Sequence, residues 1–494
     1  MSTDQQRYRS ILKASSLIGG SAFINILIGM IRTKFVAVLL GPGGVGLMGL
    51  YTTLLGPISA VTGMGLSSSG VRQIAEAHGT GNPVRVAEVV KTLRRTVWCT
   101  GLLGCLATAA LAPWLSQWTF HSAEHAVPVA LLGATILLGN IAVGQSCILQ
   151  GTRRIGDLAK MQVIGAVNGT LISIPCFYLW GIGGVLPSLI LSSAAALVTS
   201  WWFARQVSLE PVSVSRRESL SEVKRLLSFG LPIMATGLQG TLVAYFLRLV
   251  IVKQFGLEGV GIWGAAFTIS GILVGFVLNA MGTDYYPRLT AVAHDNQLVS
   301  KEVNAQTEIA LLLATPALLA TILFAPLGIQ ILYSGKFDAA IPILRWSVYG
   351  ILGRVISWPL GFIILAQGRG RLFFMMELIA NMLHIGYVYQ CSKIWGLVGT
   401  GIAFVLLYMS YVGLMIVVAH RIARTHWSRA NVNLIVGVSC VLMGAGLLNS
   451  YVKSPVYYYP LATFILAAVF LVMLRLLSVR TGVSLQSLKA CIAR

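Results

Sequence analysis

Charged side chains are scarce in this sequence. Only 10% of its 494 residues are charged, while 56% are hydrophobic, and the mean hydropathy is +0.80. Soluble domains carry about 25% charged residues. So few charges cannot cover the surface of a soluble protein of this length. The composition therefore predicts an integral membrane protein that crosses the bilayer many times.

Acidic residues are scarcer than basic ones. The chain has 15 Asp and Glu against 36 Lys and Arg, which gives a formal net charge of +21. In a soluble protein this excess would indicate binding to nucleic acid. In a membrane protein the same excess can instead set the orientation, if the cations gather in alternate loops.

Several chemical motifs are missing. The seven cysteines form no CxxC pair, so we expect neither a disulfide framework nor a metal site. The sequence has no HExxH, GxSxG or Walker loop, and no loop long enough for a separate domain. We predict no enzyme and no cofactor. Residues 1–13 are polar and basic, so the first apolar stretch is expected to remain as a span.

Long apolar stretches are abundant. A helix needs about 20 apolar residues to cross a bilayer. We predict an all-α protein with fourteen spans. Their approximate limits are 16–39, 46–69, 96–118, 127–150, 159–180, 183–204, 227–250, 260–282, 307–332, 342–365, 372–392, 397–420, 431–450 and 457–478.

The cations are unevenly divided between the loops. With the N-terminus in the cytoplasm, 27 of the 36 cations fall in inside segments. The outside loops hold only Lys253, Lys336, Lys393 and Lys453. This asymmetry predicts cytoplasmic N- and C-termini and explains the charge without nucleic acid.

The chain contains an internal repeat. Residues 40–49 resemble residues 255–264, with five identities at an offset of 215. The offset recurs at Trp180-Gly181 and Trp395-Gly396. We predict two six-helix lobes in the same orientation (1–215 and 216–426), a central cavity between them, and a C-terminal helix pair with a basic tail (427–494). The glycine-rich stretch 41–49 is expected to be a tight outside turn.

Five cations remain within or beside predicted spans: Arg32, Lys34, Arg248, Arg345 and Arg354. Arg345 is nearer the outer end of its span and is expected to be interfacial. A charge at the bilayer centre costs at least about 2.5–3.5 kcal/mol, so each of the other four is a candidate functional residue. We interpret them as a basic cavity lining for a phosphate or pyrophosphate, which suits the planar fork of Arg. The alternatives are snorkelling to the outer headgroups and pairing with an acid.

The predicted eleventh span carries Glu377, Asn381 and His384. Spacings of four and three place them on one helix face. This strip could bind a proton or a sodium ion and couple its gradient to transport. The alternative is a structural polar face toward a neighbouring helix.

The sequence resembles the Wzx-type polysaccharide flippases (O-antigen translocases) of the multidrug/oligosaccharidyl-lipid/polysaccharide exporter superfamily. The resemblance rests on LLGPGGVGL at 39–47, GMGL at 63–66, SGVRQIA at 69–75 and GVGIW at 259–263. It implies a MATE-like fold that flips undecaprenyl-pyrophosphate-linked oligosaccharides across the bacterial inner membrane by alternating access. The product would be O-antigen or exopolysaccharide. Implied partners are membrane lipids, a proton or sodium counter-ion, and a polymerase and glycosyltransferase complex.

Other functions remain open at this stage. A MATE-like antiporter of cationic drugs shares the fold, but its cavity should be acidic or aromatic, whereas cations outnumber acids within these spans. A lipid II flippase is a close relative. A membrane glycosyltransferase or polymerase would need acids or bases in a sizeable outside loop, which this sequence lacks.

Overall fold

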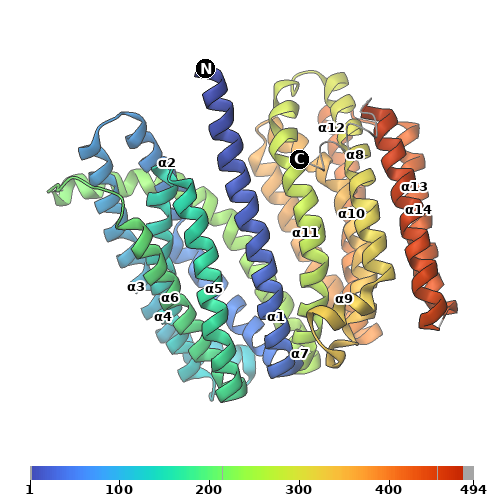
Figure 1. Cartoon of the computed structure of the whole chain (residues 1–494), viewed down its shortest axis with the longest axis horizontal. Coiled ribbons are helices and arrows are strands. Elements are labelled where there is room, and N and C mark those ends of the chain that lie inside the picture. Colours follow the sequence, from blue (N-terminus) through green and yellow to red (C-terminus); the bar gives the residue numbers. More distant parts are fainter. Residues whose placement is uncertain (1–2, 214, 453, 482–494) are drawn as a thin grey trace. The chain divides into compact units, whose positions relative to one another are not determined.

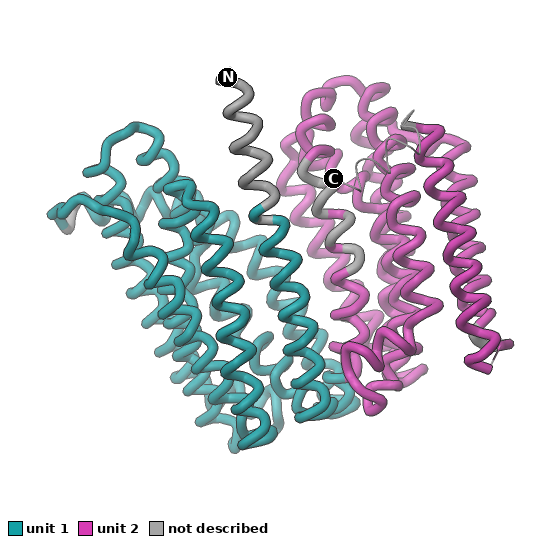
Figure 2. Tube along the Cα trace, viewed as in Figure 1, with its two compact units in different colours: residues 1–261 teal, residues 262–494 magenta. Residues whose placement is uncertain are grey.

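The computed structural model describes residues 3–213, 215–452 and 454–481, and within these ranges it contains helices and no strands (Figure 1). The all-α prediction is confirmed. The predicted loop or tail cations Lys453, Lys489 and Arg494 lie outside the described residues. Two compact units divide the chain at Gly261 and Ile262 (Figure 2), and each is described by itself below.

Unit 1 contains six complete helices, one short 3₁₀ turn and the first part of α7. The bounds are α1 (Thr3–Gly63), α2 (Leu66–Gly79), α3 (Pro83–Phe120), α4 (Ala126–Gly151), α5 (Ile155–Trp180), η1 (Gly181–Gly184), α6 (Val185–Ala204) and α7 (Arg216–Ala291). The first part of α7 packs within unit 1, where Tyr245 and Thr119 share a hydrogen bond of 2.6 Å. The lobe limits 1–215, 216–426 and 427–494 remain a prediction.

Unit 2 contains the rest of α7, seven further helices and two short 3₁₀ turns. The bounds are α8 (Asn296–Leu323), α9 (Ala325–Leu332), η2 (Gly335–Phe337), α10 (Ala340–Ala366), α11 (Gly370–Trp395), η3 (Gly396–Val398), α12 (Gly399–Ala423), α13 (Arg429–Tyr451) and α14 (Pro455–Thr481). The helix break at Phe324 falls inside the stretch predicted as one span at 307–332.

The tight turn predicted at 41–49 is much shorter in the structure and is confined to Gly41. Within α1 only Gly41 leaves the helical conformation (φ 65°, ψ −171°), and the helix resumes at Pro42. Glycine tolerates this positive φ, and proline is well suited to the first position of the new helix because its φ is already helical. The stretch from Gly43 to Gly49 is therefore helical.

The break in α1 recurs in α7. Gly256 has φ 68° and ψ −168°, and it lies at the repeat offset from Gly41. The two helices approach each other closely just beyond the breaks. A Cβ on Gly46 would overlap the carbonyl oxygen of Leu257, and a Cβ on Gly261 would overlap that of Pro42. The sequence repeat therefore corresponds to a repeat in the structure, in which equivalent glycines make equivalent close contacts.

The ends of α5 and α11 repeat one another as well. Gly181 (φ 53°) and Gly396 (φ 61°) end the two helices, and a 3₁₀ turn follows each. The next helix then starts against the previous one. A Cβ on Gly184 or Gly399 would overlap the carbonyl oxygen of Cys176 or Cys391, respectively.

Ten stretches of the described chain are long and apolar enough to cross a membrane when neighbouring helices are joined. The protein is therefore a multi-pass membrane protein. The count of fourteen separate spans remains a prediction.

Segments predicted to be cytoplasmic meet at one end of unit 1. Arg225 of α7 pairs with Glu76 of α2 at 3.1 Å. Arg85 of α3 pairs with Glu222 of α7. Arg154 donates a hydrogen bond to the carbonyl of Gln206 at 2.7 Å. These contacts agree with the alternation of loops in the charge pattern, although the side of the membrane remains a prediction.

Candidate functional site

Arg32 lies on α1 before the break and is half-buried. Its Nη1 atom is 3.8 Å from the position that a Cβ would take on Gly169 of α5. The hydroxyl of Ser192 on α6 lies beside the same position at 4.0 Å. The Nε atom of Arg32 is buried and has no hydrogen-bond partner among the described residues. A buried donor of this kind can bind an anionic oxygen at low cost, because its own desolvation is already complete.

Arg248 lies on α7 and is also half-buried. Its Nη1 atom donates to the carbonyl of Ala244 at 3.5 Å, within its own helix. Its Nε atom is 3.5 Å from the position that a Cβ would take on Gly49 of α1. Lys34 is half-buried two residues beyond Arg32. Arg32 and Arg248 thus contact different neighbours, α5 in one case and the second segment of α1 in the other.

A glycine face runs along the second segment of α1 toward Arg248. Gly49, Gly56 and Gly63 are spaced by seven residues and share one helix face. A Cβ on Gly56 would lie 3.2 Å from Thr241 of α7, seven residues before Arg248. A cavity of about 450 Å³ opens along this face. Small and polar groups line much of it, and Arg32, Lys34 and Arg248 do not.

Arg354 lies on α10 in unit 2, and its side chain is exposed. It interacts electrostatically with Tyr408 of α12, which also interacts with Glu377 of α11. The ion pairs found in the described residues do not include one between Arg354 and Glu377. Direct neutralisation of Arg354 by that acid is therefore not the arrangement in this structure.

The predicted strip on α11 divides into two environments. Glu377 accepts a hydrogen bond of 2.7 Å from the hydroxyl of Tyr411. His384 is only 8% exposed, and its ring centre is 5.7 Å from that of Phe404. The Nε2 atom of His384 has no hydrogen-bond partner among the described residues. Asn381 is half-buried between them. Since seven residues of helix span about 10 Å, Glu377 and His384 do not form a joint ligand set.

Tyr408 and Tyr411 were not predicted from the sequence. They follow Phe404 at spacings of four and three, so α12 presents an aromatic face toward α11. That spacing was visible in the sequence. Within an apolar span, however, it is equally typical of ordinary helix packing.

Comparison with known proteins agrees with this architecture. A family model described as polysaccharide biosynthesis protein matches residues 35–342, which is more than half of the chain. The chain belongs to this family. It is 23% identical over 409 residues to the lipid III flippase of Escherichia coli (strain K12), covering 82% of this chain and 97% of that protein.

Two solved structures share the fold. The lipid II flippase MurJ in an inward closed conformation has a TM-score of 0.70 at 12% identity, covering 95% of this chain and 99% of that one. An inward-facing multidrug resistance MATE family transporter of the MOP superfamily has a TM-score of 0.68 at 17% identity, covering 81% and 95%. The family resemblance and the MATE-like fold read from the sequence are both confirmed.

Proposed function

We propose that this protein flips lipid-linked oligosaccharide units across the bacterial inner membrane. The observation that carries the proposal is the buried Nε atom of Arg32, which has no hydrogen-bond partner among the described residues and lies within a predicted span. The similarity to a lipid III flippase over nearly its full length supports the same class of substrate. The finer substrate in our proposal is undecaprenyl-pyrophosphate-linked oligosaccharide for O-antigen or exopolysaccharide.

In the proposed mechanism the pyrophosphate meets Arg32, Lys34 and Arg248. A guanidinium can form two parallel hydrogen bonds to a phosphate, which offsets part of the cost of moving that charge across the bilayer. Arg354 would receive the same group from unit 2. The predicted cycle has two lobes that open a cationic cavity to each side in turn, with both termini in the cytoplasm. A polymerase and glycosyltransferases would act on either side of this step.

Coupling to an ion gradient forms a second part of the proposal. Glu377 is the carboxylate best suited to take up a proton or sodium ion, because Tyr411 orients it from a neighbouring helix. Asn381 and His384 would extend the polar path along α11. Binding of the ion would alter the hydrogen bond between α11 and α12.

The test uses the full chain in vesicles that contain a fluorescent undecaprenyl-pyrophosphate oligosaccharide. The measured quantity is the rate at which this lipid moves between the two leaflets. With wild-type protein this rate should be at least about tenfold higher than in empty vesicles. The double variant Arg32→Gln/Arg248→Gln should fall close to the empty-vesicle rate. The matched control Lys253→Gln/Lys336→Gln removes two outside-loop cations and should keep the wild-type rate. Equal rates for both double variants would contradict the cation role, and no wild-type activity would contradict the function.

A further inference from the structure

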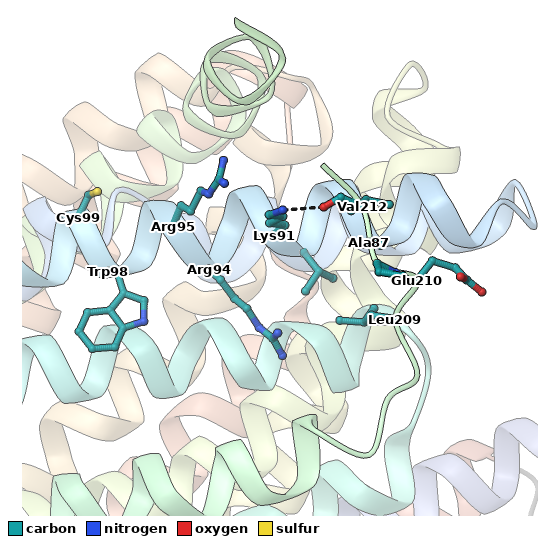
Figure 3. A pocket seen from close by; sticks show the side chains of 11 residues that line it. Ala87, Lys91, Arg94, Arg95, Trp98, Cys99, Leu209, Glu210 and Val212 are labelled. Carbon is teal, nitrogen blue, oxygen red and sulfur yellow. Dashed lines mark hydrogen bonds between the residues drawn. The ribbon is translucent and has the colours of Figure 1, made fainter. Parts of the chain in front are cut away.

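A second cationic site lies at the end of unit 1 where the predicted cytoplasmic segments meet. A groove of about 600 Å³ separates the first part of α3 from residues 209–212, which follow α6 (Figure 3). Lys91, Arg94, Arg95 and Trp98 form one wall. Their spacings of three, one and three residues place Lys91, Arg95 and Trp98 on adjoining positions of one helix face, with Arg94 beside them.

The groove carries an excess of positive charge. Lys91 donates to the carbonyl of Val212 at 2.6 Å, and Arg94 donates to the side chain of Gln145 at 3.4 Å. Arg95 is exposed. None of the three cations forms an ion pair in the described part of the chain. The Nε atom of Arg94 is buried without a hydrogen-bond partner among those residues, and the groove contains a single acid, Glu210.

Aromatic side chains place this groove at the membrane surface. Trp98 is 54% exposed, and Trp202 at the end of α6 is 51% exposed with the Arg205 guanidinium 3.7 Å from its ring centre. Exposed tryptophans gather at the level of the lipid headgroups. One to two turns further along α3, Leu102 and Leu106 are 49% and 57% exposed. The same helix face therefore changes from cationic to aromatic to aliphatic.

We propose that this groove binds the phosphate of an anionic phospholipid from the cytoplasmic leaflet, with its acyl chain along Leu102 and Leu106. The order of cations, tryptophan and leucines matches the order of phosphate, glycerol region and acyl chain in such a lipid. Lys91 also holds Val212 in the segment between α6 and α7. A bound phosphate would therefore stabilise the connection that leads into α7. This site is separate from Arg32 and Arg248 and does not depend on the proposed substrate.

The test measures lipid binding to the full chain in neutral detergent by native mass spectrometry. The probes are dioleoylphosphatidylglycerol, dioleoylphosphatidylcholine and inorganic phosphate. We expect each chain to bind one phosphatidylglycerol molecule tightly and phosphatidylcholine much more weakly. Millimolar inorganic phosphate should not displace the bound phosphatidylglycerol. Lys91→Gln/Arg95→Gln should weaken phosphatidylglycerol binding about thirtyfold, since each surface cation contributes about one kcal/mol. The control Lys160→Gln/Arg371→Gln removes two exposed cations elsewhere and should change the affinity less than twofold.

Three results would overturn the proposal. They are equal losses in the two double variants, an unchanged affinity in Lys91→Gln/Arg95→Gln, or inorganic phosphate that binds as tightly as the lipid. The melting temperature in phosphatidylcholine alone reports whether the variants are folded. Should the double variant fail this check, the single variant Arg95→Gln at an exposed position replaces it, with an expected loss of about fivefold. An unchanged affinity in that variant would equally contradict the proposal.

Discussion

Positions 169 and 384 correspond to each other in the two repeats, yet one is a glycine and the other a histidine. Gly169 on α5 has no side chain, and the guanidinium of Arg32 approaches to 3.8 Å from its Cβ position. His384 on α11 is buried beside Phe404. Similarly, Gln162 on α5 stands where α11 has Glu377, and Gly139 on α4 stands where α10 has Arg354.

The glycines at the turns, by contrast, are the same in both repeats. Gly41 and Gly256 break α1 and α7, and Gly184 and Gly399 allow close helix contacts. The repeat thus separates two kinds of position. The paired glycines allow the backbone conformation and helix contacts that both repeats share. At other positions the repeats differ, and several of these carry polar groups that we propose bind the substrate or the ion.

The largest effect should come from the paired glycines themselves. Gly184→Ala and Gly399→Ala would each drive a methyl group into a backbone carbonyl, which flexible side chains cannot relieve. We expect a destabilisation of about 1–3 kcal/mol or more and little folded protein. Gly183→Ala, with nothing within 4 Å of its Cβ position, is the control. The measurement is the folded fraction after detergent extraction, and equal yields for Gly183→Ala and Gly184→Ala would refute the close contact.

The next effect tests the space beside Arg32. Gly169→Leu would fill the position that the guanidinium approaches, so we expect the oligosaccharide transport rate per folded protein to fall about tenfold. Gly165→Leu, one turn earlier on α5 with nothing within 4 Å, should transport normally. A wild-type transport rate for Gly169→Leu would show that this space is not used by the substrate.

Replacing an acid by its counterpart in the other repeat tests coupling. Glu377→Gln gives α11 the residue that α5 has at the paired position. We expect the transport rate with an imposed proton or sodium gradient to drop to the rate without one, since no group remains to take up the ion. Tyr411→Phe keeps the carboxylate while removing its hydrogen bond, and it should retain part of the gradient dependence. Full gradient dependence in Glu377→Gln would exclude this residue as the coupling site.

The smallest effect concerns the turns before α5 and α11. Arg153 (φ 58°) and Gly368 (φ 71°) are paired by the repeat and share a left-handed conformation. Arg153→Gly should relieve backbone strain and stabilise the protein by less than about 1 kcal/mol, while Gly368→Arg should destabilise it by about 1–2 kcal/mol. Arg153 is exposed, so few contacts are lost. Thermal melting of the two variants checks the opposite signs, and shifts of the same sign would contradict the account.

The sequence predicted the helical class and the repeat because each depends on composition or spacing. It made the turn at 41–49 too long, since a single glycine followed by a proline suffices to break α1 and restart it. The match between Arg153 and Gly368 was invisible because the repeat keeps the conformation there and not the residue. Likewise, no spacing rule tells which carbonyl faces Gly46 or which hydroxyl orients Glu377, because both contacts come from other helices.

The most direct test of the central claim compares headgroups. Binding of undecaprenyl pyrophosphate and undecaprenyl monophosphate to the purified chain would be measured for the wild type and for Arg32→Gln/Arg248→Gln. If the cations recognise the pyrophosphate, the wild type should prefer the pyrophosphate by about tenfold and the double variant should lose that preference. The same preference in both proteins would contradict the claim that these cations select the headgroup.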